Sequence, residues 1–256
     1  DVQSSADGRH IPIQRVGVKS VRVPVVVASV DGPLHTVATV NMYVSLPAGQ
    51  KGTHMSRFFR LLDETREPLC KPVLEDLMAR MLKTLDAVSG QIEFDFPFFV
   101  RKSISKQSSL MSYEAGFTVT CENGETTVRE RVLTPVTSLC PCSKEISRYG
   151  AHNQRSHITI DALCSEALPF EELIRYSEKN GSCELWSLLK REDEKFVTEY
   201  AYDHAKFVED IIRDVATDLN KDARIVSYEL QVENFESIHN HSAYALITHD
   251  RRTSAV

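Results

Sequence analysis

The stretch that decides the fold is SYEAGFTVTCENGETTVRERVLTPV, residues 112–136. Asn123-Gly124 at its centre is a strong signal for a two-residue hairpin turn, because both residue types tolerate a positive φ. We therefore expect residues 112–121 and 126–136 to form an antiparallel pair of strands. This pair joins the two halves of the chain, so it predicts that both halves share one continuous sheet.

The segments on either side of the hairpin repeat one order of elements. Residues 35–46 alternate cleanly, with Val40, Met42 and Val44 facing one way, as in a half-buried strand. Residues 72–88 carry leucine and methionine at helical spacing, and Gly90 is expected to end that helix. The expected elements are strands 16–30 and 35–46, helices 54–64 and 72–88, and strands 92–98 and 112–121, then strands 126–136 and 156–163, helices 169–179 and 203–219, and strands 224–233 and 241–248.

This doubled strand-strand-helix-helix-strand-strand order predicts an α+β protein, with antiparallel sheet and helices on one face. We expect residues 1–14 to form a mobile arm, 15–121 a first module and 122–256 a second module. No linker rich in Pro, Gly or Ser separates the modules, so they are effectively one domain. Such a sheet has long free edges, which are usually removed by pairing with another copy. We therefore expect a homo-oligomer.

The composition is that of an ordinary soluble globular protein, with 256 residues of which 42% are hydrophobic and 26% charged. The net charge of −6 gives no indication of nucleic-acid binding. No apolar run approaches the length of a membrane span. Six cysteines in a chain of this length do not make a disulfide framework. We expect reduced thiols in a cytoplasmic protein, with neither nucleic acid nor membrane as a partner.

The strongest chemical signal is a Cys-Pro-Cys pair, Cys140 and Cys142, followed closely by His152. Thiolate sulfur and imidazole nitrogen are ligands that zinc and similar transition metals prefer. This set is too small for a closed structural site, but a catalytic metal needs an open position. The alternatives are small buried cysteines and a solvated loop histidine.

Other candidate residues are weaker. His239 and His241 flank Asn240 in a predicted tight turn, where they could bind metal or transfer protons, or simply form a polar hairpin tip. Glu194 lies in a charge run that is solvated by default. Glu209 is expected at the margin of a buried helix face, where a carboxylate needs a partner. Residues 50–57 precede a helix and could hold an anion through Lys51 and Arg57, without a known phosphate motif.

The chain contains the motifs PVTSLCPCSKEI, GAHNQRSH, KGTHMSRF, DEKFVTE, KFVEDIIRDVA and ENFESIHNHSAYA. Taken together, these motifs resemble the type IB GTP cyclohydrolase I family, the prokaryotic form. The resemblance spans about residues 17–245, and the Cys-x-x-His metal pair of the differently built type IA enzyme is absent from the sequence. It implies the tunnelling fold, in which sheets from several subunits close into a barrel, with two fused modules per chain and four chains per assembly.

The resemblance also implies roles for individual residues. Cys140, His152 and Glu194 match the family's metal ligands, and the metal is a divalent ion, zinc or manganese and possibly iron. Glu209 matches the carboxylate that anchors the guanine edge. Cys142, His239 and Glu236 match residues near the imidazole ring that opens during the reaction. Together with Cys140, they are the expected catalytic residues. For the triphosphate, we expect Lys51, Arg57 and Arg155 to supply positive charge, without a strict motif basis.

The implied reaction converts GTP and water into 7,8-dihydroneopterin triphosphate and formate, the entry to folate-type pterins. Active sites are then expected between subunits of a homotetramer. Two alternatives stay open at this point. One is the related archaeal iron-dependent cyclohydrolase, which makes a cyclic-phosphate product. The other is a non-catalytic tunnelling-fold protein that binds metal or purine and releases no formate.

Overall fold

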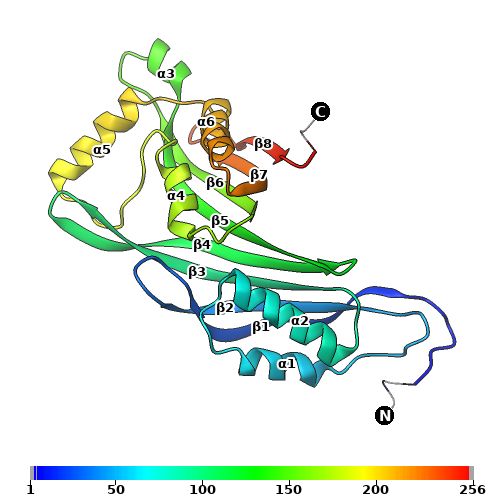
Figure 1. Cartoon of the computed structure of the whole chain (residues 1–256). Helices are drawn as coiled ribbons and strands as arrows, with labels where there is room; N and C mark the ends of the chain where they lie inside the picture. The colour runs from blue at the N-terminus through cyan, green and yellow to red at the C-terminus, as the bar shows by residue number, and fades with distance from the viewer. Residues whose placement is uncertain (1–2, 4, 254–256) are drawn as a thin grey trace. The chain divides into compact units, whose positions relative to one another are not determined.

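The computed structural model describes residue 3 and residues 5–253 (Figure 1). Within them the hydrogen-bonded order of strands is β1-β2-β3-β4-β5-β6-β7-β8, which follows the chain. The strands are β1 (Ile13–Val27), β2 (Leu34–Leu46), β3 (Gly90–Ile104), β4 (Gln107–Glu122), β5 (Glu125–Leu139), β6 (Asn153–Cys164), β7 (Ile225–Asn234) and β8 (Ala243–Asp250). The helices are α1 (Met55–Glu64), α2 (Lys71–Leu85), α3 (Pro141–Ile146), α4 (Phe170–Glu178), α5 (Arg191–Asp203) and α6 (Val208–Lys221).

The chain divides into two compact units. The first contains residues 1–97 and 116–130, and the second contains residues 98–115 and 131–256. The α+β class with an antiparallel sheet is therefore confirmed among the described residues. The prediction of modules at 15–121 and 122–256, with a mobile arm at 1–14, stays a prediction.

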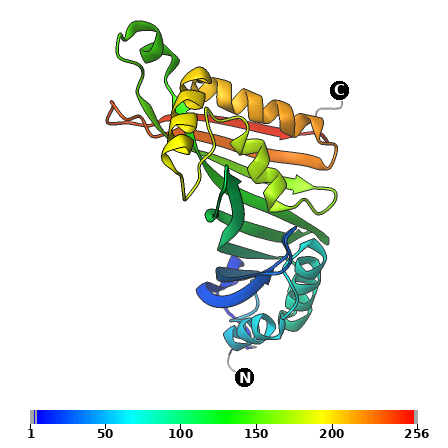
Figure 2. The ribbon, with the colours of Figure 1, turned by 90° about the vertical axis from the view of Figure 1, so that its left-hand side faces the viewer.

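In the first unit, antiparallel strands β1, β2 and β3 carry helices α1 and α2 on one face (Figures 1 and 2). Alternate residues of β2 point into the space beneath the helices, and Val40 and Met42 are fully buried. Leu74, Leu77 and Met78 of the apolar stripe of α2 are also fully buried. The core of this unit therefore lies between one sheet face and two amphipathic helices.

The second unit repeats this arrangement. Strands β6, β7 and β8 pair in antiparallel order, and α4 and α6 cover one face of them (Figure 2). Ile158 and Leu230 from the strands and Ile211 and Val215 from α6 are fully buried. The same binary pattern therefore builds the second core.

The predicted hairpin at Asn123-Gly124 is confirmed. β4 ends at Glu122 and β5 begins at Glu125, and the two central residues have φ of 52° and 80°. Positive φ at both positions is what a two-residue turn matching the strand twist requires. A turn also joins β1 to β2, where the backbone N–H of Gly32 donates to Ser29 O at 3.2 Å and Gly32 has φ 108°.

Two helix predictions were wrong at their ends. The helix expected at 203–219 begins at Val208, and residues 191–203 form α5, which was not predicted as a helix. The helix expected at 72–88 ends at Leu85, because Asp86 adopts a left-handed conformation with φ 52°, and Gly90 instead begins β3. The second half therefore contains α3 and α5 in addition to the repeated order of elements.

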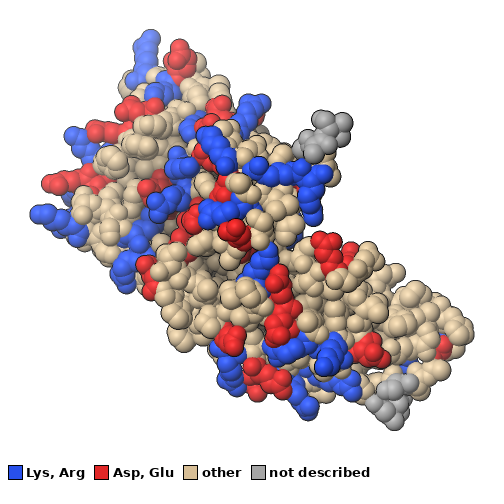
Figure 3. Space-filling view, in the orientation of Figure 1, with Lys and Arg blue, Asp and Glu red and all other residues tan. Residues whose placement is uncertain are grey.

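Charged side chains of both signs are mixed on one face of the protein. On the face drawn in Figure 3, Lys and Arg are interspersed with Asp and Glu. None of the helices within the described part of the chain is long and apolar enough to cross a membrane. All six cysteines lie among the described residues and are free thiols.

Candidate active site

The Cys-Pro-Cys pair lies where β5 ends and α3 begins. Cys140 is the residue before the helix, in extended conformation, and Pro141 takes the first helical position, where its missing N–H costs nothing. The side chain of Cys140 is partly buried and that of Cys142 is exposed. The two thiols therefore lie at one edge of the second unit, open to a ligand.

The chain then turns back and brings His152 beside Cys140. Gly150 adopts φ 107°, a conformation that favours glycine, just before β6 begins. The backbone N–H of Cys140 donates to the carbonyl oxygen of His152 at 3.2 Å. The backbone N–H of His152 donates to Ser143 Oγ at 3.3 Å, which ties the returning chain to α3. The backbones of Cys140 and His152 therefore lie next to each other within one chain.

The imidazole of His152 is held through one ring nitrogen. Its Nδ1 lies 3.0 Å from Gln154 Oε1 and 3.2 Å from Ser237 Oγ. Ser237 belongs to residues 235–242, the connection between β7 and β8. Sequence reasoning singled out neither partner, because both are ordinary polar residues whose proximity to His152 depends on how the strands pair.

The connection between β7 and β8 carries Glu236, His239 and His241. It is eight residues long rather than the tight turn that was predicted, since β7 ends at Asn234 and β8 begins at Ala243. His239 and His241 are exposed and stacked, with ring centroids 5.0 Å apart. The segment is anchored at its start, because the backbone N–H of Phe235 donates to the carbonyl oxygen of Arg155 at 3.0 Å.

Glu209 lies in the first turn of α6 and is exposed, which corrects the prediction that it sits at the margin of a buried face. The helix begins at Val208, so Glu209 lies at its solvent-exposed start, while the expected apolar residues Ile211, Ile212 and Val215 are buried. The segment before α6 is tied to the end of β5, because the backbone N–H of Lys206 donates to Leu139 O at 3.1 Å.

Figures 1 and 2 show how these segments are arranged in the second unit. The start of α6, helix α3 and the connection between β7 and β8 gather at one end of it. Cys140, Cys142, His152 and Glu209 therefore come from segments that meet at this end.

Glu194 lies in the second unit but apart from Cys140 and His152. It lies in the first turn of α5 and lines a cavity of about 1010 Å³ together with Ser105, Lys106 and Lys190. The other end of α5 touches α3, where Lys144 Nζ donates to Tyr202 O at 2.5 Å. Tyr202 is the eighth residue after Glu194 in the helix, which is about 12 Å along the axis. Of the three predicted metal ligands, one chain brings Cys140 and His152 together and leaves Glu194 apart.

Consistent with this separation, no three His, Cys, Asp or Glu side chains group closely enough to hold a metal ion anywhere in residues 3 and 5–253. The set of Cys140, His152 and Glu194 stays a prediction for the assembled protein.

The three basic residues predicted for the triphosphate have different surroundings. In the first unit, Arg57 Nη1 donates to Thr84 O at 2.8 Å, and the backbone N–H of Lys51 donates to Ser5 O at 3.1 Å. In the second unit, Arg155 is an exposed residue of β6, next to Gln154. Their role stays a prediction.

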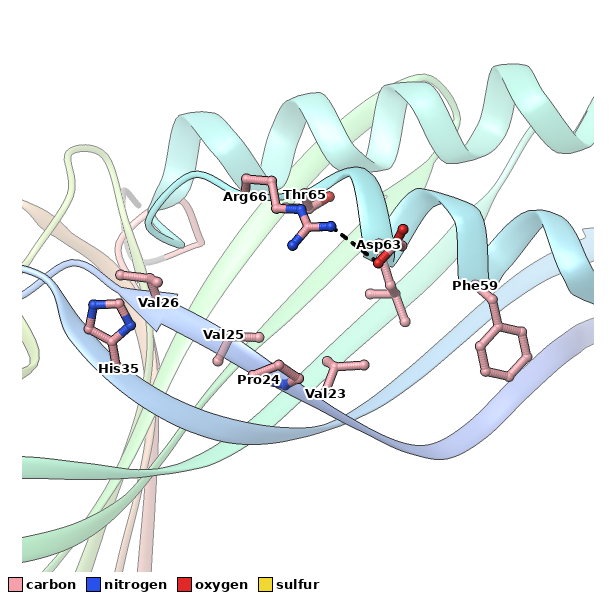
Figure 4. Close-up of a pocket in the computed structure, with 10 residues that line it drawn as sticks. Val23, Pro24, Val25, Val26, His35, Phe59, Asp63, Thr65 and Arg66 are labelled. Atoms are coloured by element: carbon pink, nitrogen blue, oxygen red, sulfur yellow. Dashed lines mark hydrogen bonds and ion pairs between the residues drawn. The ribbon is translucent and has the colours of Figure 1, made fainter.

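A separate cavity of about 460 Å³ lies in the first unit between β1 and α1 (Figure 4). Val23, Val25 and Phe59 give it apolar walls, and an ion pair between Arg66 and Asp63 at 3.3 Å lies at its rim. None of the predicted site residues lines it.

Residues 1–245 match the family model described as type I GTP cyclohydrolase folE2. The chain belongs to this family. It is 60% identical over 254 residues to the GTP cyclohydrolase FolE2 of Ralstonia nicotianae, a match covering 98% of this chain and 95% of that protein. It is 58% identical over 256 residues to the GTP cyclohydrolase FolE2 of Herminiimonas arsenicoxydans, covering 99% and 98% of the two chains.

Among solved structures, the FolE2-family chain is similar to the uricase from Arthrobacter globiformis, with a TM-score of 0.57 and 95% of each chain covered. The sequence identity is 10%, so this likeness shows the fold alone. It confirms the predicted tunnelling fold of antiparallel strands with helices.

Proposed function

We propose that this chain hydrolyses GTP to 7,8-dihydroneopterin triphosphate and formate, as a GTP cyclohydrolase I of folate biosynthesis. The observation that carries the proposal is the match of nearly the whole chain to the FolE2 family, at 60% identity to a named GTP cyclohydrolase. Assignment to the prokaryotic type IB branch is the finer part of the proposal. It is supported by the Cys140-Pro141-Cys142 motif and by the absence of a Cys-x-x-His pair from the sequence.

The residues fit a divalent metal such as zinc or manganese. Cys140 and His152 provide a thiol and an imidazole from two chain segments that are hydrogen bonded to each other. Nδ1 of His152 is engaged by Gln154, so Nε2 is the nitrogen available for coordination. With Glu194 as third ligand, the metal would supply Lewis acidity for the addition of water to C8 of guanine.

The third ligand is proposed to come from a second copy of the chain. Glu194 lies at the end of α5 that is remote from α3, so within one chain it is separated from Cys140. The aromatic side chains of α5 also support a contact between copies. Phe196 and Tyr200 lie one helical turn apart and are 52% and 41% exposed, which is unusual for large aromatic side chains without a partner. A homotetramer with active sites between subunits accounts for both features.

The remaining residues are proposed to bind GTP and move protons. Glu209 is exposed at the start of α6, where its carboxylate can accept two N–H groups from the guanine edge. His239 would donate a proton to the imidazole nitrogen as the ring opens, with Cys142 and Glu236 beside it. A second hydration then releases the C8 carbon as formate, and the ribose rearranges to close the pyrazine ring. Lys51, Arg57 and Arg155 are the proposed partners of the triphosphate.

The decisive experiment measures formate release from GTP by metal-stripped protein, before and after zinc or manganese is restored. Cys140→Ala is expected to abolish metal-dependent formate release. Cys70→Ala is the matched control, because Cys70 is also a partly buried cysteine just before a helix with proline in its first turn. It should retain the activity of the unmodified protein.

The outcomes of this experiment separate the alternatives. Formate together with a linear triphosphate product supports the proposal. Formate with a cyclic-phosphate product would indicate the archaeal type of reaction. GTP binding without formate under every divalent metal would contradict the enzyme assignment and leave a binding protein.

A further inference from the structure

Beneath His152 lies a run of buried polar side chains that the proposed chemistry does not use. Ser138, Gln154, Ser156 and Asn234 come from β5, β6 and β7 and are at most 8% exposed. Burying a polar group costs free energy unless it is hydrogen bonded, and apolar residues would fill the same space at lower cost. We therefore expect these buried polar side chains to have a role other than filling the core.

The four side chains form one continuous chain of hydrogen bonds. Gln154 Nε2 lies 2.9 Å from Ser138 Oγ. Ser138 Oγ lies 2.7 Å from Ser156 Oγ, and Ser156 Oγ lies 2.7 Å from Asn234 Oδ1. The far end of Gln154, Oε1, faces Nδ1 of His152 at 3.0 Å.

The direction in which each hydrogen bond is donated follows from the donors and acceptors that these four side chains offer. Asn234 Oδ1 only accepts, so Ser156 must give it the single proton of its hydroxyl. Ser138 must then donate to Ser156, and its own oxygen accepts from Gln154 Nε2. Each bond fixes the next, so the amide of Gln154 is held with its oxygen toward His152.

An amide oxygen can only accept a hydrogen bond, so the ring proton of His152 is held on Nδ1. The lone pair then lies on Nε2. We propose that Gln154, held by Ser138, Ser156 and Asn234, is a positioning residue that presents Nε2 of His152 to the metal. This inference rests on the proposed function, in which His152 is a metal ligand. Hydrogen bonding of the non-coordinating nitrogen commonly sets the tautomer and orientation of a histidine ligand.

If these hydrogen-bonded side chains only stabilised the fold, the effect of substitutions at position 154 would differ from that expected for a positioning role. If the run only ties three strands together, a buried carboxylate at position 154 should be at least as damaging as an apolar side chain. If instead the run serves His152, a carboxylate should be tolerated, because its oxygen still accepts from Nδ1–H.

The test is metal affinity in the absence of GTP, measured by competition with a chromophoric zinc chelator on the full-length protein. Gln154→Leu is expected to weaken zinc binding about 10- to 100-fold. Gln154→Glu should restore binding to within a few-fold of the unmodified protein. Gln231→Leu is the matched control, since Gln231 lies on β7 and bonds to Glu229 rather than to the run.

The controls keep this inference separate from the proposed function. If Cys140→Ala removes zinc binding but Gln154→Leu does not, the metal site stands and the role of Gln154 is wrong. If Gln154→Glu binds zinc as weakly as Gln154→Leu, the chain of hydrogen bonds is structural only. If the unmodified protein binds no zinc that depends on Cys140, the proposed metal site itself fails.

Discussion

At the scale of single residues, Asp222 shows how one carboxylate can join three elements. Its side chain accepts hydrogen bonds from the guanidinium and backbone N–H of Arg224 and from the hydroxyl of Tyr176. These partners connect the end of α6, the approach to β7 and helix α4. The hydrogen bonds from Arg224 are the main cause that lowers the pKa of Asp222 from 3.8 to about 2.

Asp222→Asn is therefore expected to destabilise the protein by about 1 kcal/mol at pH 7, since Arg224 is partly exposed and its attraction is screened. A carboxylate with a lowered folded-state pKa stabilises the fold above its unfolded pKa and loses that contribution as the pH falls. The difference from the unmodified protein should thus shrink between pH 4 and about pH 2. Urea unfolding at several pH values measures it, with the exposed Asp31→Asn as control. A difference that stays constant with pH would contradict the electrostatic origin.

At the scale of elements, helix α5 is held by its start rather than by a buried face. Only Asp193 and Ala201 of its residues are buried. Asp193 accepts a hydrogen bond from the backbone N–H of Lys190 at 3.0 Å, which satisfies the first N–H before the helix. It also accepts from Ser105 Oγ at 2.5 Å, which ties α5 to the turn between β3 and β4. Helix α6 begins in the same way at Asp210 but buries a full apolar stripe.

We expect Asp193→Ala to loosen the first turn of α5, which carries Glu194. Loss of such a capping interaction typically costs about 1 kcal/mol, so amide exchange in residues 191–196 should become roughly fivefold faster. Asp210→Ala is the matched control, and its helix should keep most of its protection because of its buried side chains. Hydrogen exchange with mass spectrometry measures both. Equal changes in the two helices would show that burial does not set the stability of these helix starts.

The same contrast explains which elements could be predicted from the sequence. The hairpin at Asn123-Gly124 is encoded locally, in two residues that accept positive φ, and it was found. Helix α5 has no apolar stripe, because its aromatic side chains lie on an exposed face, so the periodic pattern that marks a helix is missing. The late start of α6 was missed because the apolar pattern around Phe207 continues across the cap.

In the candidate site, too, features set by local sequence could be predicted and features set by tertiary packing could not. The approach of Cys140 and His152 follows from the short loop between two neighbouring strands, and the sequence motif predicted it. The hydrogen bonds of His152 to Gln154 and Ser237 depend on how the strands and their connections fold together, which no local pattern encodes. The separation of Glu194 from these residues depends on the direction of α5, for the same reason.

At the scale of the whole molecule, two copies of the chain are proposed to build one active site. Cys140 and His152 lie together in one chain, while Glu194 lies at the far end of α5. If a second copy supplies Glu194, then a chain lacking Cys140 and a chain lacking Glu194 are each inactive alone but complementary. This property separates a shared site from one formed within a single chain.

The most direct measurement is therefore formate release from GTP by mixed assemblies of Cys140→Ala and Glu194→Ala chains. Each variant alone should release no formate. After unfolding and refolding together in equal amounts with zinc or manganese, random pairing should restore about a quarter of the sites. We expect formate release near that level, because each restored site would combine residues of two copies. An inactive mixture, with assembly and GTP binding intact, would contradict it, because both residues would then act within one chain.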